Sequence, residues 1–290
     1  MKEIYVNFIA ARLSIKSWQV ENCVELFADG ATIPFVSRYR KERTGGLDEV
    51  DVAEVKHWND VFDDMEKRKS TILETIDAAG ALTEELKGAI EKCTDANELE
   101  DLYLPYRPKR RTRATVAREA GLEPLADQMW EIKLRDPLSE ARKYVGEKVA
   151  DEETALGMAR DIVAERLSEM PAVREALRRI FLSCRLCSSR TKNADSLPEA
   201  AKYRSWFDFS MPLPKIAPHQ LLAILRAENE GVLSVKIAAD ATACGKKIYY
   251  EFSKGKPWPS EELRAHLNMA VDDAFKRLLE PSISGEVLKF

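Results

Sequence analysis

The sequence lacks the signals that would direct this chain into or across a membrane. No run of apolar residues approaches the roughly 20 that a transmembrane helix requires. The first residues, MKEIYVNFIAARL, place Glu3, Asn7 and Arg12 inside an apolar pattern, which indicates an amphipathic helix and not a signal peptide. We therefore expect a cytoplasmic protein without a membrane partner.

Cysteine is scarce, and its spacing fits neither a disulfide framework nor a common metal site. The odd number and scattered positions argue against disulfides. Cys184 and Cys187 form a lone CxxC, but zinc would need a second pair or suitably spaced histidines, and His57, His219 and His266 are isolated. We expect small, buried or half-buried thiols and no metal ion or other cofactor. The cysteines are Cys23, Cys93, Cys184, Cys187 and Cys244.

Motifs of common enzymes are also missing. The sequence has no Walker loop, no GxGxxG after a strand, no GxSxG and no HExxH. Two acidic pairs, Asp63-Asp64 and Asp272-Asp273, are expected inside helices, where adjacent side chains diverge by about 100° and cannot aim at one metal ion. We expect no catalytic residue, no small-molecule substrate and no enzyme activity.

The residues that are present favour a mainly α-helical protein. Charged residues make up 32% and hydrophobic residues 45% of a chain of 290 residues, which is typical of globular proteins and long enough for two domains. The pattern predicts a multi-helix array that begins with a helix-turn-helix-like pair, residues 3–13 and 18–29. Because the second helix carries Glu21, Glu25 and Asp29, it is poorly suited to face DNA phosphates. We expect the pair to be scaffold.

Residues 48–79 are predicted to form one long central helix, on the order of 45–50 Å in length. Its apolar residues follow a 3-4 spacing that Lys69 interrupts. Such a stripe indicates either a coiled-coil seam between two copies or a spine within one chain. We favour the spine, because short helices on both sides need a surface to bury against. Trp58 and Phe62 are then expected to pack against the N-terminal helices.

The remaining pattern predicts further helices and little β structure. Residues 231–238 alternate apolar and polar side chains, which indicates a strand. Residues 246–252 are its expected partner, in a minor β hairpin near residues 231–252. Residues 183–217 are expected to be mainly loops with room for one short hairpin. The other predicted helices span residues 83–93, 95–104, 124–130, 138–149, 152–168, 171–182, 219–231 and 260–279, the last ended by Pro281.

The most distinctive feature is a basic run in a chain of formal net charge −4. Residues 107–118 hold six basic residues and no acid. Pro105 and Pro108 favour an extended conformation, so we expect these cations to lie along a loop. Such a strip suits a phosphate backbone, because neutralised phosphates release counterions; it can equally pair with the protein's own carboxylates or solvate a loop. The cations are Arg107, Lys109, Arg110, Arg111, Arg113 and Arg118.

A second basic cluster lies upstream, with Tyr39 among its cations and only Glu42 opposing them. The tyrosine either stacks on an unpaired base or serves as the apolar anchor of a loop. Both clusters are candidate nucleic-acid-binding sites. The cations of the second cluster are Arg38, Arg40, Lys41 and Arg43.

Five long segments carry a resemblance to a known family. In order, they are GATIPFVSRYRKERTGGLDEV, EKRKSTIL, ELEDLYLPYRPKRRTRATVAREAGLEPLA, KYRSWFDFSMPL and LLAILRAENEGVLSVKI. Together they resemble the N-terminal half of the bacterial Tex family of transcription accessory proteins. Members of this family are relatives of a eukaryotic transcription elongation factor that travels with RNA polymerase.

The resemblance implies a domain organisation. Full-length members continue into an RNase H-like module, helix-hairpin-helix motifs and a C-terminal S1 RNA-binding domain, none of which is in this sequence. We therefore interpret the chain as a fragment that stops about where the RNase H-like module would begin. Residues 1–190 are expected to form the Tex-like N-terminal helical domain, residues 191–217 connecting loops, and residues 218–290 a second, mostly helical subdomain leading toward the absent module.

Two functions of different classes follow. In the first, the chain is the non-catalytic N-terminal region of a Tex-like transcription accessory protein, and its two basic clusters bind the backbone of RNA or DNA with little regard to sequence. In the second, it is a docking scaffold whose arginines or long helix bind RNA polymerase or other domains of the intact protein, without direct nucleic-acid contact. An arginine strip serves a phosphate and a carboxylate equally well, so both remain open.

Overall fold

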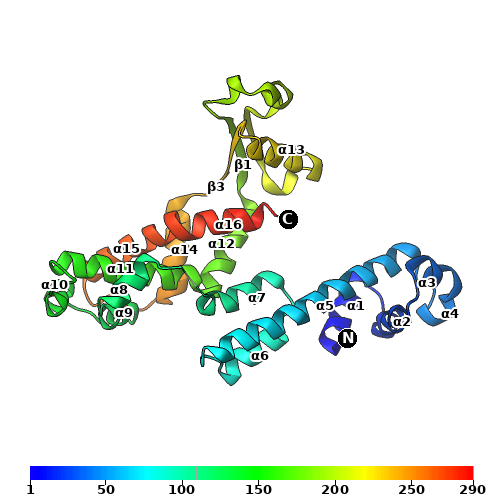
Figure 1. Cartoon of the computed structure of the whole chain (residues 1–290), viewed down its shortest axis with the longest axis horizontal. Coiled ribbons are helices and arrows are strands. Elements are labelled where there is room, and N and C mark those ends of the chain that lie inside the picture. The colour runs from blue at the N-terminus through cyan, green and yellow to red at the C-terminus, as the bar shows by residue number, and fades with distance from the viewer. Residues whose placement is uncertain (109, 290) are drawn as a thin grey trace. The chain divides into compact units, whose positions relative to one another are not determined.

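The computed structural model describes residues 1–108 and 110–289, apart from the side chains at positions 195 and 199. These residues divide into two compact units, Met1–Arg107 and Pro108–Phe290, whose elements are labelled in Figure 1. The protein is mainly helical and has a small antiparallel sheet of three strands, which confirms the predicted fold class. Within the described ranges, no helix is both long and apolar enough to cross a membrane.

The N-terminal unit is organised around one long helix, α5. Helices α1, α2, α3, α6 and α7 all contact it. The elements of this unit are α1 (Glu3–Leu13), α2 (Ser17–Ala28), α3 (Ile33–Tyr39), α4 (Lys41–Thr44), α5 (Glu49–Ala78), α6 (Glu84–Lys92), α7 (Ala96–Tyr103) and a 3-10 turn at Leu104–Tyr106.

Short polar side chains begin three of these helices. At the start of α5, the Asp48 carboxylate accepts hydrogen bonds from the amides of Val50 (2.8 Å) and Asp51 (2.9 Å). Thr83 caps α6 and Asp95 caps α7 in the same way. These caps satisfy amides that have no partner inside the helix. The predicted boundaries of α5, α6 and α7 are therefore confirmed to within one or two residues, and those of α1, which has no side-chain cap, agree as well.

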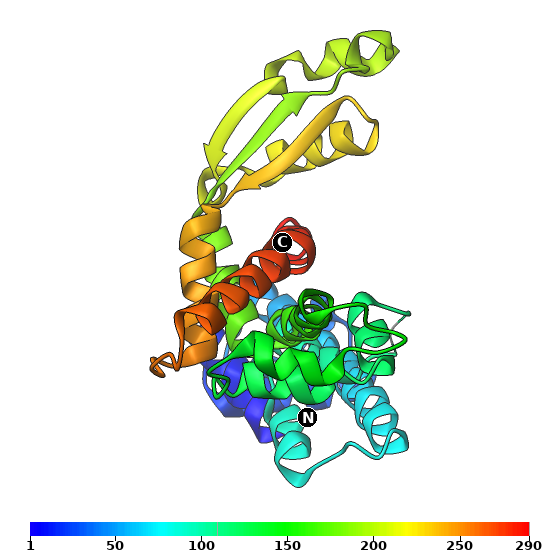
Figure 2. The same ribbon diagram turned by 90° about the vertical axis from the view of Figure 1, so that its left-hand side faces the viewer.

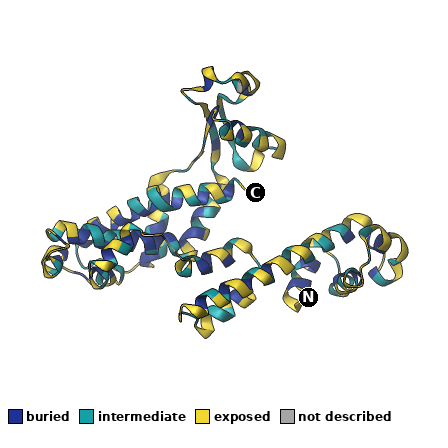
Figure 3. Cartoon of the chain, viewed as in Figure 1, coloured by how far each residue is buried: buried dark blue, intermediate teal, exposed yellow. Residues whose placement is uncertain are grey.

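The apolar stripe of α5 is buried within the chain, as Figure 3 shows by the colour of its inner face. Phe62 is 1% exposed. Its ring stacks on Tyr5 with 4.2 Å between centroids and meets Phe8 edge-on at 5.3 Å. Trp58 is half-buried beside Phe8, and the Arg12 guanidinium lies 4.6 Å from its ring centroid. The spine interpretation is confirmed, because α1 provides the surface against which these rings pack.

Lys69, the charged residue that interrupts the stripe, is buried, with 2% of its surface exposed. Its ammonium donates hydrogen bonds to the Tyr5 hydroxyl (2.7 Å) and to the carbonyls of Cys93 (2.6 Å) and Glu91 (3.0 Å). Glu66 lies 3.4 Å away. The last carbonyls of a helix have no partner within it, so Lys69 satisfies the end of α6 from inside the core.

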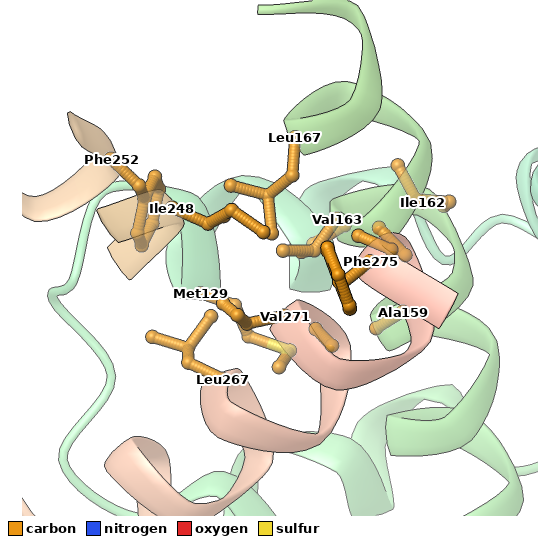
Figure 4. Packing of buried hydrophobic residues seen from close by; sticks show 14 of the residues in the cluster. Met129, Ala159, Ile162, Val163, Leu167, Ile248, Phe252, Leu267, Val271 and Phe275 are labelled. Carbon is orange, nitrogen blue, oxygen red and sulfur yellow. The ribbon is translucent and has the colours of Figure 1, made fainter. Parts of the chain in front are cut away.

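The C-terminal unit is centred on α11, which α8, α9, α10, α12 and α15 contact. Figure 4 shows Val163 and Leu167 of α11 in one apolar cluster with Ile248, Val271 and Phe275. The elements are α8 (Arg113–Glu119), α9 (Glu123–Trp130), α10 (Pro137–Ala141), α11 (Glu152–Glu169), α12 (Pro171–Ser183), β1 (Arg185–Arg190), β2 (Asp208–Pro212), α13 (Pro218–Asn229), β3 (Leu233–Ala238), α14 (Ala241–Ser253), α15 (Glu261–Asp273), a π segment (Ala274–Leu279) and α16 (Glu280–Val287), with 3-10 turns between several of them.

The predicted hairpin near residues 231–252 is wrong in its second strand. The strand β3 is present, but residues 246–252 belong to α14, where Cys244, Ile248 and Phe252 recur every four residues and are buried. The partner of β3 is β1, which lies in the middle of the order β2-β1-β3. Leu186 pairs with Ile237 of β3 on one side and with Met211 of β2 on the other.

Two other predictions need correction. The helix predicted at residues 138–149 is only α10, followed by a 3-10 turn. Pro281 does not end the last helix, because the π segment precedes it and α16 continues with Ile283 and Val287 buried. Along the chain, the two compact units divide after Arg107. The domain boundaries expected at residues 190 and 217 stay a prediction, and the segment between them contributes to the sheet and its small core.

The five cysteines occupy different environments. Cys23, Cys93 and Cys244 are buried, and burial raises the pKa of each thiol to about 11. Cys184 caps the end of α12, and the Cys187 sulfur lies 3.3 Å from the Ser210 hydroxyl.

We predict that metal analysis of the purified protein will find zinc well below one equivalent and that Cys187→Ser will leave thermal stability nearly unchanged. Stoichiometric zinc that survives dialysis would contradict this.

His266 of α15 is buried, and its Nδ1 lies 2.6 Å from the Arg160 guanidinium. Since arginine only donates, Nδ1 accepts and the ring is neutral. Burial and then the charge of Arg160 lower the pKa of His266, and Glu153 and Glu262 oppose them. Its folded-state pKa therefore lies below the unfolded value of about 6.5. Stability is complete above that value and is lost as the pH falls through the folded pKa, because the unfolded chain binds the proton first.

We expect the melting temperature to fall between about pH 7.5 and 5.5, with part of this fall removed by His266→Gln. His219→Gln is the matched control, because His219 is exposed. It should retain the pH dependence of the wild type. Thermal melts across this range test the assignment, and identical slopes in both variants would rule it out.

Candidate nucleic-acid interface

The basic run is part loop and part helix, not the continuous loop expected from its prolines. The loop ends at Thr112, whose hydroxyl accepts a hydrogen bond from the Thr115 amide at 3.0 Å and caps α8. Arg113 is consequently the first residue of a helix, and Arg118 lies in its last turn. Sequence reasoning missed this because the capping signal, a threonine before a run of helix formers, lies among the cations.

Arg110 and Arg113 are available cations among the described residues of the run. Both are exposed, and neither forms an ion pair with another residue in the described part of the chain. Arg107 is exposed and belongs to the N-terminal unit. Lys109 lies outside the described residues.

Arg111 is paired but remains accessible. Its guanidinium lies 2.7 Å from the Glu119 carboxylate, with 70% of the arginine side chain and 52% of the glutamate side chain exposed. Exposed pairs of this kind contribute about 0–1 kcal/mol. A phosphate can therefore compete for Arg111 at little cost.

Arg118 forms ion pairs within the protein. It donates to Glu165 of α11 at 2.8 Å and lies 3.5 Å from Glu123. The Thr112 hydroxyl donates to the same Glu165 at 2.9 Å. Burial lowers the pKa of Arg118, but the hydrogen bond and charge of Glu165 outweigh it and the pKa is raised. Arg118 thus fastens α8 to α11, and only its exposed part is left for a ligand.

The second cluster is carried by α3, α4 and the residue between them. Arg38 is exposed and lies 3.9 Å from Glu49, and Arg43 pairs with Glu25 at 2.5 Å. Lys41 is exposed and forms no ion pair with the other described residues. The Arg40 guanidinium lies 4.9 Å from the centroid of the Phe35 ring. The four cations, which are close in the sequence, therefore also lie close together on the N-terminal unit.

Helix α2 holds this cluster in place. The amide groups of Gln19 and Asn22 donate to the carbonyls of Thr44 (2.8 Å) and Arg43 (2.7 Å). Gly45 then ends α4 with φ of 66°, and a Cβ atom at this position would lie 2.5 Å from the Trp18 ring. Only glycine combines this left-handed conformation with so close an approach.

A hollow of about 520 Å³ lies beside the cluster. Arg40 and Arg43 contribute cations to its lining, Phe35 an aromatic face and Asp29 an opposing charge. Tyr39 is 65% exposed, with its ring 5.6 Å from that of Phe35. It is not the buried anchor of a loop, and its ring face is available for stacking.

Comparison with known proteins identifies two matching regions. The family described as Tex-like protein N-terminal domain matches residues 3–77, and the family described as Tex central region-like matches residues 133–289. The basic run lies between the two matches.

Curated relatives extend over nearly the whole chain. Protein YhgF of Escherichia coli is 40% identical over 243 residues, which are 83% of this chain and 31% of the relative. Protein tex of Bordetella pertussis is 40% identical over 235 residues, 80% of this chain and 30% of the relative. Transcriptional accessory protein Tex of Neisseria gonorrhoeae is 33% identical over 300 aligned positions, 98% of this chain and 39% of the relative. This chain spans about a third of the length of these relatives, and it belongs to the Tex-like family, of which it contains the N-terminal and central regions.

Proposed function

We propose that this chain is the non-catalytic N-terminal and central part of a transcription accessory protein, acting in the cytoplasm, and that it binds the backbone of RNA or DNA with little sequence preference. The name of the gonococcal relative, a transcriptional accessory protein, supports the first part. The basic run supports the second.

One observation carries the binding proposal: Arg110 and Arg113 are exposed and form no ion pair with the described residues of a chain with formal net charge −4. In such a chain nearby acids are abundant, yet neither cation is in ion-pair contact with one, although the charge of Arg113 acts on Asp161. Arg111 adds a third cation from an exchangeable surface pair. Cations displayed in this way favour phosphates, because binding releases the counterions condensed on a nucleic acid.

The 38–43 cluster supports the same ligand class. It combines two exposed cations, Arg38 and Lys41, with the exposed ring of Tyr39. Aromatic rings next to cations bind unpaired bases by stacking, worth about 1–3 kcal/mol per base. This feature favours single strands over duplexes as the ligand of the N-terminal unit.

The loop is tested by replacing Arg110, Arg111 and Arg113 with Glu and titrating salt against single-stranded RNA, single-stranded DNA and duplex DNA. Affinity should fall by a similar factor for every sequence. The slope of log affinity against log salt should become shallower by about 1 for each phosphate that the variant no longer neutralises. Arg118 is left intact because it fastens α8 to Glu165.

The matched control replaces Arg135, Arg204 and Lys215 with Glu. These three cations are exposed in the same unit, so the change in net charge is the same. Unchanged affinity and slope in a folded loop variant, or an equal reduction in the control, would exclude the loop as the binding surface.

The alternative function is a docking scaffold for RNA polymerase or for other domains of the intact protein. The pair between Arg111 and Glu119 favours it, since the run already binds one carboxylate. In this case nucleic-acid affinity is unaffected by the loop variant, whereas its binding to purified RNA polymerase is reduced.

A further inference from the structure

A second hollow, of about 550 Å³, lies on the C-terminal unit, far along the sequence from both basic clusters. It is formed by α14 and α15, which are connected by residues 254–260 and pack against each other. Figure 2 shows the two helices side by side. Seven polar residues line it: Thr242, Lys246 and Tyr249 from α14, Arg264, Asn268 and Asp272 from α15, and Lys276 from the π segment. A volume of this size suits a small ligand such as a nucleotide.

The lining is strongly cationic. Lys246 and Lys276 are exposed, and neither forms an ion pair with any residue that the structure describes. Arg264 has a loose contact with Glu261 at 3.5 Å, where 85% of the glutamate side chain is exposed, and it lies beside the Tyr249 hydroxyl. Asp272 is the one acid in the described lining. Three positive charges therefore face one negative charge, in a chain whose overall balance is negative.

The spacing of these residues explains why the hollow exists. Thr242, Gly245, Lys246 and Tyr249 recur at three- and four-residue intervals, so they share one face of α14. Gly245 provides room on that face, because a Cβ atom there would meet nothing closer than the Val271 side chain at 3.8 Å and Asp272 at 4.0 Å. On α15, Arg264 and Asn268 are four residues apart and face the same space.

Tyr249 adds a phenol beside Arg264. Its hydroxyl oxygen is buried and makes no hydrogen bond of ordinary geometry to the described residues, and its ring packs on Trp258 at 4.7 Å. Burial raises the pKa of Tyr249, against the charge and the N–H groups of the adjacent Arg264, so the phenol stays protonated at neutral pH. A ligand oxygen that reaches this hydroxyl would satisfy its hydrogen-bonding capacity.

We propose that this hollow binds the phosphate monoester group of a nucleotide, with Lys246, Lys276 and Arg264 neutralising its charge and Tyr249 donating to one of its oxygens. A phosphate monoester fits better than a carboxylate, because it carries up to two charges and three oxygens for cations arriving from both helices. The phosphate belongs either to a free nucleotide or to the 5′ end of a nucleic-acid strand.

Isothermal titration with AMP tests the site. The 290-residue chain should bind AMP, and Lys246→Gln combined with Lys276→Gln should weaken binding at least about tenfold, because each substitution removes a charge-assisted hydrogen bond to the phosphate. Lys215→Gln combined with Lys236→Gln, two exposed lysines outside the hollow, should leave it unchanged. Absence of AMP binding, or an equal reduction in the control, would overturn the proposal.

Three further experiments sharpen the result. Tyr249→Phe should weaken AMP binding severalfold and should keep or raise the melting temperature. If Tyr249 were merely structural, the substitution would leave the affinity for AMP unchanged. A ten-nucleotide thymidine strand with a 5′-phosphate, compared with the same strand lacking it, distinguishes a strand end from a free nucleotide. Arg110→Gln with Arg113→Gln should leave AMP affinity intact, so this proposal and the backbone-binding proposal can fail independently.

Discussion

Phe62→Ala should lower the free energy of unfolding of the N-terminal unit by about 3–5 kcal/mol, the usual cost of removing a buried aromatic ring. Phe62 is 1% exposed, stacks on Tyr5 and meets Phe8, so its removal leaves a cavity where α1 packs on α5. Chemical denaturation followed by far-ultraviolet circular dichroism measures the change. Phe35→Ala, at a partly exposed ring in the same unit, should cost much less.

Sedimentation at micromolar concentration distinguishes this core role from a seam between two copies. A core role predicts that wild type and Phe62→Ala have the same oligomeric state and differ in stability. A wild-type dimer that the substitution converts into a folded monomer of undiminished stability would refute it.

Lys69→Met should destabilise the same unit by about 3 kcal/mol or more. Methionine has a similar length and no donor, so the carbonyls of Glu91 and Cys93 and the hydroxyl of Tyr5 each lose a hydrogen bond. A buried group left unsatisfied costs about 1–3 kcal/mol. The exposed Lys67 of the same helix pairs with Asp64 at the surface, so Lys67→Met should leave stability nearly unchanged.

A double-mutant cycle with Tyr5→Phe isolates the hydrogen bond between the ammonium and the hydroxyl. We expect the two substitutions to be non-additive, because each removes the same hydrogen bond. A neutral or stabilising Lys69→Met would mean that the cost of burying the ammonium exceeds what its hydrogen bonds return.

Local signals predicted most of the helices, and long-range pairing explains the failures. The caps Asp48, Thr83 and Asp95 act on amides two or three residues away, so they can be recognised in the sequence. Residues 246–252 are rich in aromatic residues, which favours a strand, but α14 packs on α12 through a four-residue apolar repeat. The true partner of β3 lies more than forty residues upstream in β1, whose sequence RLCSSR is too polar to stand out.

The sequence predicted which residues make up the candidate site, but not which of their side chains are exposed to a ligand. The sequence located both basic clusters, yet it could not distinguish Arg118, fastened to Glu165 in α11, from Arg110, which is exposed. The burial of Lys69 depends on carbonyls from the end of α6, 22 and 24 residues away. Lys246 and Lys276 line one hollow only because α14 and α15 pack together, and no motif connects them along the chain.

The π segment at residues 274–279 makes the length of the last helical stretch as important as its composition. A π turn holds one residue more than an α turn. Removing one residue from this segment can therefore convert it to an α turn and leave Ile283 and Val287, both buried, in the apolar cluster. Removing one residue from the regular helix α15 instead rotates every following residue by about 100° and carries the same two side chains out of the cluster. A single deletion is therefore expected to be tolerated better within residues 274–279 than within α15.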